Sequence, residues 1–338
     1  MDLTLTNSAA LFGSAIAMGF GALGAGEALG QVCVGSVRAM ATQPQQNGSL
    51  LRSMLIGQAI ASNPSIFALV IAILLYTFGV QELSPAVANS LVCAAAMLGS
   101  GIAVGFGAIG SGSGNGRIGQ EAVVAMARCP RHTSRLTVMM VVSQAVASNP
   151  SIFALVVAIL LYTMGLQAPD AGLANNWAYA AALISAGISI GLGAIGSGLG
   201  NGWNGGDAMD AMARCPEQSG KITMMMLVGQ AVGQTPALFA LVISLILIVQ
   251  SGECSRYVDL SDQIAHTGRL LGMGISIGFG AIGSGLGSSD IGGKLCKALA
   301  RAPQISGKLN NVYFVGVGVS QSCAIYAFVI SLLLMSAN

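Results

Sequence analysis

Few side chains in this sequence can bind a cation or exchange a proton, and those that can lie at regular places in long apolar segments. Glu27 is an acid 17 residues before Pro44, which is about 25 Å along a helix. Four polar pairs occupy one equivalent place in four further apolar segments: Ser62–Asn63, Ser148–Asn149, Gln234–Thr235 and Gln321–Ser322. A carboxylate can hold a proton or a small cation, whereas hydroxyl and amide groups coordinate ions or water, or bond to a neighbouring helix. Two kinds of chemistry therefore stay open, ion binding and hydrogen bonding between helices.

These residues are placed by a unit that repeats four times along the chain. The glycine-rich segment that begins at Gly21 returns at Gly107, Gly193 and Gly280, with spacings of 86, 86 and 87 residues. A proline follows each of these glycines after 23 residues, and a second apolar stretch follows each proline. Repetition at a fixed period predicts four copies of one supersecondary unit.

Each unit holds two apolar segments of more than 20 residues, which is enough for each to cross a ~30 Å hydrocarbon core as a helix. A short polar segment with proline or glycine joins them, so each unit is predicted to be a helical hairpin. The four hairpins are expected at 1–86, 87–172, 173–259 and 260–338. The sequence therefore predicts an all-α, multi-pass membrane protein with eight transmembrane helices.

Composition supports this fold and excludes several functions. Charged residues make up 8% of the 338 residues, where soluble proteins have about 25%, and the mean hydropathy is +0.75. A formal net charge of +2 gives no basic surface for nucleic acid, so no nucleic-acid partner is expected. The residues show no nucleophile–base pair and no metal-ligand spacing, so we expect no catalytic site, metal or cofactor in this chain.

Basic residues are concentrated around the four hairpin loops. The windows 35–52, 121–138, 207–224 and 294–311 hold 11 of the 14 Lys and Arg residues but only 4 of the 12 acids. By the positive-inside rule, the hairpin loops are predicted on the cytoplasmic or matrix side and both termini on the opposite side.

The first helix of each unit is rich in small residues, as in GFGAIGSGSGNGRIG at 105–119. Small residues let helix backbones approach closely in lipid. Small residues on several faces predict an inner layer in which each first helix contacts two like helices and its own hairpin partner. The bulkier second helices would form an outer layer that faces lipid.

The motifs MARCP (126–130 and 212–216), MATQP (40–44), LARAP (299–303), GQAIASNPSIFALV (57–70) and GQAVGQTPALFALV (229–242) occur at equivalent places in the repeats. In these motifs the chain resembles the c subunit, or proteolipid, of rotary F- and V-type ATP synthases, as a tandem fusion of four hairpins. The resemblance covers nearly the whole chain. It implies that the chain forms an arc of a two-layered rotor ring.

The resemblance also implies partners and a location. A ring of this kind carries H⁺ or Na⁺ past a stator a-type subunit in an energy-transducing membrane, bacterial or organellar. Its loops, here with Arg128, Arg214 and Arg301, turn a central stalk. Other copies of the chain, or other c-type chains, would complete the ring, with membrane lipid around it and in its lumen.

One feature departs from the family pattern. The family carries its ion on a carboxylate midway along the second helix, and the four copies place Ser62, Ser148, Gln234 and Gln321 there. None of these side chains titrates, which argues against ion carriage at this level. Two interpretations stay open for the polar pairs, hydrogen bonds between helices or a residual ion or water site. Carbonyls freed by the prolines that follow them could bond a hydroxyl or a cation.

Glu27 also has more than one interpretation. An acid at this depth is a candidate ion carrier. It could instead be a satisfied polar group, or form an ion pair within the inner layer with Arg117, one turn further along the equivalent helix of the next copy. Two functions also stay open: a rotor-ring subunit that couples ion transport to rotation, or a structural ring element that kept c-type packing and lost ion carriage.

Overall fold

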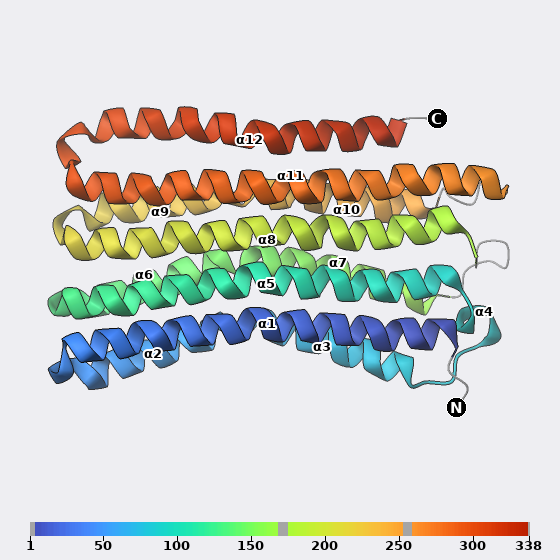
Figure 1. Cartoon of the computed structure of the whole chain (residues 1–338), viewed down its shortest axis with the longest axis horizontal. Coiled ribbons are helices and arrows are strands. Elements are labelled where there is room, and N and C mark those ends of the chain that lie inside the picture. The colour runs from blue at the N-terminus through green and yellow to red at the C-terminus, as the bar shows by residue number, and fades with distance from the viewer. Residues whose placement is uncertain (1–3, 168–174, 253–258, 337–338) are drawn as a thin grey trace.

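The structure, a computed structural model, describes residues 4–167, 175–252 and 259–336, and all regular elements in these ranges are helical. It contains eight helical spans that are long and apolar enough to cross a membrane: Leu5–Thr42, Pro44–Gly79, Leu91–Arg128, Pro130–Leu166, Trp177–Arg214, Pro216–Ser251, Leu260–Arg301 and Pro303–Ser336. They form four tandem hairpins, with the tight turns at one end of the molecule and the N- and C-termini at the other (Figure 1). The prediction of an all-α membrane protein of four hairpins is confirmed.

The first helices of the hairpins lie side by side in one layer (Figure 1). They are α1 (Leu5–Thr42), α5 (Leu91–Arg128), α8 (Trp177–Arg214) and α11 (Leu260–Arg301). Glycines set their spacing: a Cβ placed on Gly112 of α5 would lie 2.8 Å from the carbonyl carbon of Gly24 in α1, and one on Gly285 of α11 would lie 2.9 Å from that of Gly196 in α8. Because real Cβ atoms do not fit at such distances, the glycines are what lets these backbones touch.

The second helices pack on this layer, three of them behind it in Figure 1, and α12 packs on α11. They are α2 (Asn47–Ala61) with α3 (Asn63–Gly79), α6 (Thr133–Ala147) with α7 (Asn149–Leu166), α9 (Ser219–Gly233) with α10 (Thr235–Ser251), and α12 (Ser306–Ser336). Short 3₁₀ turns that begin at proline join the layers: η1 (Pro44–Gln46), η2 (Pro130–His132), η3 (Pro216–Gln218) and η5 (Pro303–Ile305). A one-turn helix, α4 (Pro85–Ala88), lies between the first and second hairpins. Exposed Ile73 and Tyr76 on α3 suit an outer layer in contact with lipid.

Three of the four outer helices are broken halfway along, and proline explains the break. Pro64, Pro150 and Pro236 each lie in the first turn of the second half. Proline has no N–H to donate to the residue four positions earlier, so the helical ladder is interrupted. The fourth copy has Cys323 at this place, and α12 runs unbroken from Ser306 to Ser336.

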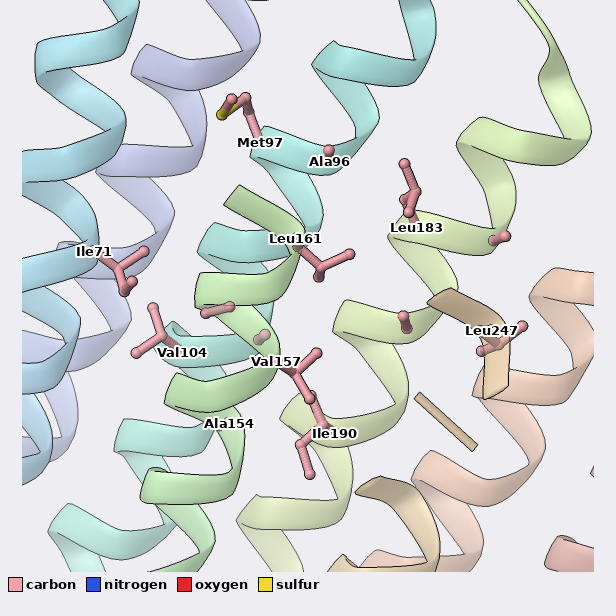
Figure 2. Packing of buried hydrophobic residues seen from close by; sticks show 14 of the residues in the cluster. Ile71, Ala96, Met97, Val104, Ala154, Val157, Leu161, Leu183, Ile190 and Leu247 are labelled. Atoms are coloured by element: carbon pink, nitrogen blue, oxygen red, sulfur yellow. The ribbon is translucent and has the colours of Figure 1, made fainter. Parts of the chain in front are cut away.

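Apolar side chains fill the space between the layers (Figure 2). Ile71 of α3 and Val157 of α7 are fully buried with Val104 of α5 and Ile190 of α8 in one cluster. Methyl and branched side chains of both layers therefore hold the hairpins together, while glycine sets the distance between neighbours within the inner layer.

Candidate functional site

The four places where the family pattern expects a carboxylate form a polar belt halfway along the outer layer. Ser62, Ser148 and Gln234 separate the two halves of the broken helices, and Gln321 lies at the same place in α12. The outer helices that the structure describes carry no acid at this level. What the belt can do therefore depends on its hydroxyl and amide groups.

In the third hairpin, the belt residue binds the hairpin before it. Gln234 Nε2 donates to the carbonyl oxygen of Val146 at 2.9 Å. Val146 lies four residues before Pro150, so its carbonyl is the one that the proline leaves without a helical donor. Asn149 Nδ2 in turn donates to Gln234 Oε1 at 3.2 Å. The amide of Gln234 thus replaces, from the next hairpin, the hydrogen bond that Pro150 removes.

The fourth hairpin repeats this arrangement one copy further on. Gln321 Nε2 donates to the carbonyl oxygen of Val232 at 3.0 Å, and Val232 lies four residues before Pro236. Ser284 Oγ of α11 lies 3.2 Å from Gln321 Oε1, to which it donates. The carbonyls freed by Pro150 and Pro236 therefore accept from amides of the neighbouring hairpin rather than from the hydroxyl groups that the sequence analysis considered.

The first two hairpins have serine at this place and different bonds. Ser148 Oγ accepts from Asn115 Nδ2 at 2.8 Å and donates to the Gln144 carbonyl at 2.9 Å. Ser62 Oγ donates to the Ala59 carbonyl in its own helix at 2.9 Å, and Asn63 begins α3. These contacts favour the hydrogen-bonding interpretation of the belt.

Glu27 lies on α1, in the inner layer. Its carboxylate accepts a hydrogen bond from Ser113 Oγ of α5 at 2.6 Å and one from Gln31 Nε2 at 2.8 Å. Both partners are inner-layer residues, so Glu27 is a hydrogen-bonded acid that joins the first hairpin to the second.

The ion pair considered between Glu27 and Arg117 is not formed among the residues that the structure describes. Arg117 instead extends toward the third hairpin, where its Nη2 lies 3.8 Å from Asp207 Oδ1. Its guanidinium also lies 5.9 Å from the ring centroid of Trp203, which adds a cation–π contact. Both partners lie on α8, on the side away from α1, which separates Arg117 from Glu27.

Asp207 is the centre of a charge cluster that sequence analysis missed. It is 2% exposed and accepts hydrogen bonds from Lys294 Nζ at 2.9 Å and from Lys297 Nζ at 2.7 Å. Lys294 also pairs with Asp290 at 3.1 Å, one turn away on the same helix. Asp207 lies near the end of α8 and is buried between the third and fourth hairpins.

Asp210 plays the same part between the second and third hairpins. It pairs with Arg128 across that junction and with Arg214 Nε at 3.0 Å within α8. Arg128, Arg214 and Arg301, the residues proposed to meet a stalk, all lie in the last turn of their helices, at the end where the hairpins turn. Two of the three are thus already bonded within the arc.

The repeat itself contained the signal for one of these pairs. Asp207 and Lys294, which bond each other, occupy the same place in consecutive copies, 87 residues apart. Opposite charges at one place of a repeat become neighbours when the copies pack side by side.

The hairpins form two layers, glycines set the distance between the inner helices, and polar groups lie halfway along the outer helices. These features define a membrane proteolipid whose hairpins pack side by side. The family model that describes the C subunit of ATP synthase matches the chain four times, at residues 12–75, 98–161, 184–247 and 271–334. Because these matches cover more than half of the chain, the protein belongs to the family of ATP synthase c subunits.

Curated relatives agree, each with one hairpin's length of this chain. The ATP synthase c subunit of Petrotoga mobilis is 50% identical over 70 residues, which is 21% of this chain and 73% of the relative. That of Thermotoga petrophila is 43% identical over 77 residues, 23% of this chain and 91% of the relative. The resemblance found from the motifs is confirmed, and the chain is a c subunit in the form of a four-hairpin fusion.

Proposed function

We propose that this chain fills four adjacent places of an ATP synthase rotor ring and transmits rotation, while H⁺ or Na⁺ is carried on carboxylates of other hairpins in the ring. The observation that carries the proposal is the belt itself. All four of its places are uncharged, and Gln234 and Gln321 use their amides to bond the hairpin before them. A neutral amide cannot take up and release a proton, and Oε1 of each glutamine already accepts a hydrogen bond, from Asn149 and from Ser284, instead of binding a cation.

The position of Glu27 also supports the proposal that other hairpins carry the ion. An ion carrier must meet the stator at the outer surface of the ring, but both hydrogen-bond partners of Glu27, Ser113 and Gln31, lie on inner-layer helices. The acid is therefore assigned to the bond between α1 and α5. The chain then contributes packing and torque transmission and leaves the ion to its ring neighbours.

The hairpin turns are the proposed contact with the central stalk. Arg301 is exposed, and the Arg128 and Arg214 side chains are about half exposed beside their bonds to Asp210. Because basic residues gather around these turns, we place them on the cytoplasmic or matrix side, with the termini opposite. The stator a-type subunit would meet the outer layer.

A labelling experiment on the intact enzyme tests the proposal. ATP synthase that contains this chain is purified from its native membrane and treated with dicyclohexylcarbodiimide, which reacts with protonatable carboxyl groups in the membrane. We expect ATP-driven ion uptake to stop, with the label on other hairpins of the ring and none on Glu27.

Two results would contradict the proposal. Label on Glu27 that rises in step with the loss of uptake would make this chain an ion carrier. A purified enzyme whose rotor lacks the chain would remove it from the ring altogether.

A further inference from the structure

The four-hairpin arc has two open sides, α1 and α11, at opposite sides of the inner layer (Figure 1). On α1, a Cβ added to Gly26 or Gly30 would meet nothing within 4 Å. Their equivalents on α5 are filled: a Cβ on Gly112 would lie 2.8 Å from the Gly24 backbone, and one on Gly116 would lie 2.9 Å from the Ala28 carbonyl oxygen. The open side of α1 therefore has the glycines of an internal junction, but no neighbouring helix packs against them.

The open side of α11 has the surface that faces the next hairpin at an internal junction. A Cβ added to Gly283 meets nothing within 4 Å, whereas one added to the equivalent Gly110 would lie 2.5 Å from Ile195 in the next helix. Phe279 is 62% exposed, and its equivalent Phe20 packs edge-on against Phe106, with ring centroids 5.0 Å apart. Both sides therefore fit a c-type hairpin in shape, and charge decides which hairpin.

Opposite charges form ion pairs near the hairpin turns at two of the three internal junctions. From the second to the third hairpin, Arg128 reaches Asp210. From the third to the fourth, Asp207 accepts from Lys297 at 2.7 Å and from Lys294 at 2.9 Å. The carboxylates are the buried partners, 2% exposed for Asp207, so these pairs are part of how hairpins recognise one another.

The repeat shows which residues would meet if a second copy of this chain docked on α11. Arg38 occupies on α1 the place that Asp210 occupies on α8 and Lys297 on α11. At the internal junctions, the residue at this place forms an ion pair with the preceding helix. Asp210 pairs with Arg128, and Lys297 pairs with Asp207.

On α11, the places of these two partners hold Arg301 and Lys294. A second copy would therefore bring Arg38 between two cations. The acids nearest to them are already engaged, because Asp207 and Asp290 bond Lys294. Among the described residues, no ion pair includes Arg38 or Arg301. The two open sides match in shape and repel in charge.

We propose that the neighbour on each open side is a different chain, a c-type hairpin with carboxylates at the places of Asp207 and Asp210. When this hairpin docks on α11, its carboxylate at the place of Asp210 accepts from Arg301, as Asp210 accepts from Arg128. When it docks on α1, its carboxylate at the place of Asp207 accepts from Arg38, as Asp207 accepts from Lys297. The third hairpin of this chain, which carries both acids, shows that one hairpin can satisfy both sides. The inference rests on the proposed function, since such neighbours would also be the ion carriers.

Charge reversal tests the inference on the full chain. The chain is produced alone in membranes, extracted in mild detergent and weighed by native mass spectrometry. We expect wild-type chains to stay single or in open assemblies. Arg38→Glu should raise the share of closed rings made only of this chain by about tenfold or more, because like charges across an interface become opposite ones. Arg301→Glu should act in the same direction, by pairing with Arg38.

Arg131→Glu is the matched control, because it reverses the same charge in the turn of the second hairpin, away from both open sides. It should leave the share of closed rings unchanged. The double variant Arg38→Glu/Arg301→Glu places two acids face to face and should close fewer rings than either single variant.

Wild-type chains that close rings as readily as Arg38→Glu would overturn the inference, as would a lipid headgroup or a second copy found on Arg301 in the native ring. A homomeric ring in a working ATP synthase would refute the mixed ring and keep the chain in the rotor. If charge reversal closes rings but the chain is never found in ATP synthase, the inference about charge holds and the proposed function fails. The two proposals can therefore fail separately.

Discussion

The polar belt of the outer layer and the charged cluster near the hairpin turns join neighbouring hairpins with different kinds of side chain. In the belt, Gln234 and Gln321 are neutral and bond to backbone carbonyls of the neighbouring hairpin. Near the turns, Asp207 and Asp210 are buried acids, each with two or more basic partners. Both of these buried acids are paired, and the belt has no carboxylate in the part of the chain that the structure describes.

The difference shows where charge is tolerated in this arc. Halfway across the membrane an ionised group is costly unless it is paired, and the belt avoids that cost with amides. Near the turns, lysine and arginine side chains keep one end in water while they neutralise an acid between hairpins. The chain holds its hairpins together by neutral hydrogen bonds in the middle and by charge at the end.

The largest effect is expected from Asp207→Asn in the charged cluster. The substitution keeps the shape of the side chain but leaves Lys294 and Lys297 facing a neutral group. Removing one partner of a buried pair costs about 3 kcal/mol, the low end of the usual range, because both ammonium groups are partly exposed. Unfolding of the purified chain by sodium dodecyl sulfate in mixed micelles measures the change in free energy.

Asp290→Asn is the control for this experiment. Asp290 also bonds Lys294, at 3.1 Å, but its side chain is 45% exposed. An exposed pair one turn apart contributes about 0.5 kcal/mol or less. Equal losses in the two variants would show that the cluster stabilises the helix α11 and not the junction between hairpins.

Much of the fold was accessible from sequence because the repeat and the helix periodicity are local or periodic signals. The glycine spacing predicted an inner layer, and α1, α5, α8 and α11 form one. The partners of Asp207 lie 87 and 90 residues away. They become neighbours only when two hairpins pack, so the sequence analysis did not find the cluster.

The belt shows a second limit of sequence analysis. The prolines predicted which carbonyls lose their donor, since that follows from covalent structure. They could not predict what replaces it. The Val146 carbonyl is bonded by Gln234 because close packing of consecutive hairpins aligns the two, and that alignment is a property of the arc.

A smaller effect is expected from Gln234→Leu in the belt. The leucine leaves the Val146 carbonyl without a donor in an apolar place, which costs about 1–3 kcal/mol. Gln321→Leu should behave alike, because Gln321 bonds the Val232 carbonyl in the same way. Free energies from the same micelle titration test both.

Ser62→Ala is the matched control in the belt. Among the described residues, the Ser62 hydroxyl bonds only the carbonyl of Ala59 in its own helix, so its loss should change the free energy of unfolding by less than about 0.5 kcal/mol. A loss as large as that of Gln234→Leu would mean that polarity at this level matters, and not the bond between hairpins.

A smaller effect than in the belt glutamines is expected from Glu27→Gln, the substitution that most directly compares ion carriage with hydrogen bonding. Glutamine keeps one acceptor oxygen, so it retains a bond with Ser113 or Gln31 and loses the other. Stability should fall by about 1 kcal/mol or less. Ser113→Ala removes the same contact from the other side and should cost a similar amount.

ATP-driven ion uptake by the intact enzyme should be unchanged in both variants if Glu27 only joins α1 to α5. Uptake lost in Glu27→Gln and kept in Ser113→Ala would show instead that the acid itself moves the ion, and the neutral belt would then have a charged substitute in the inner layer.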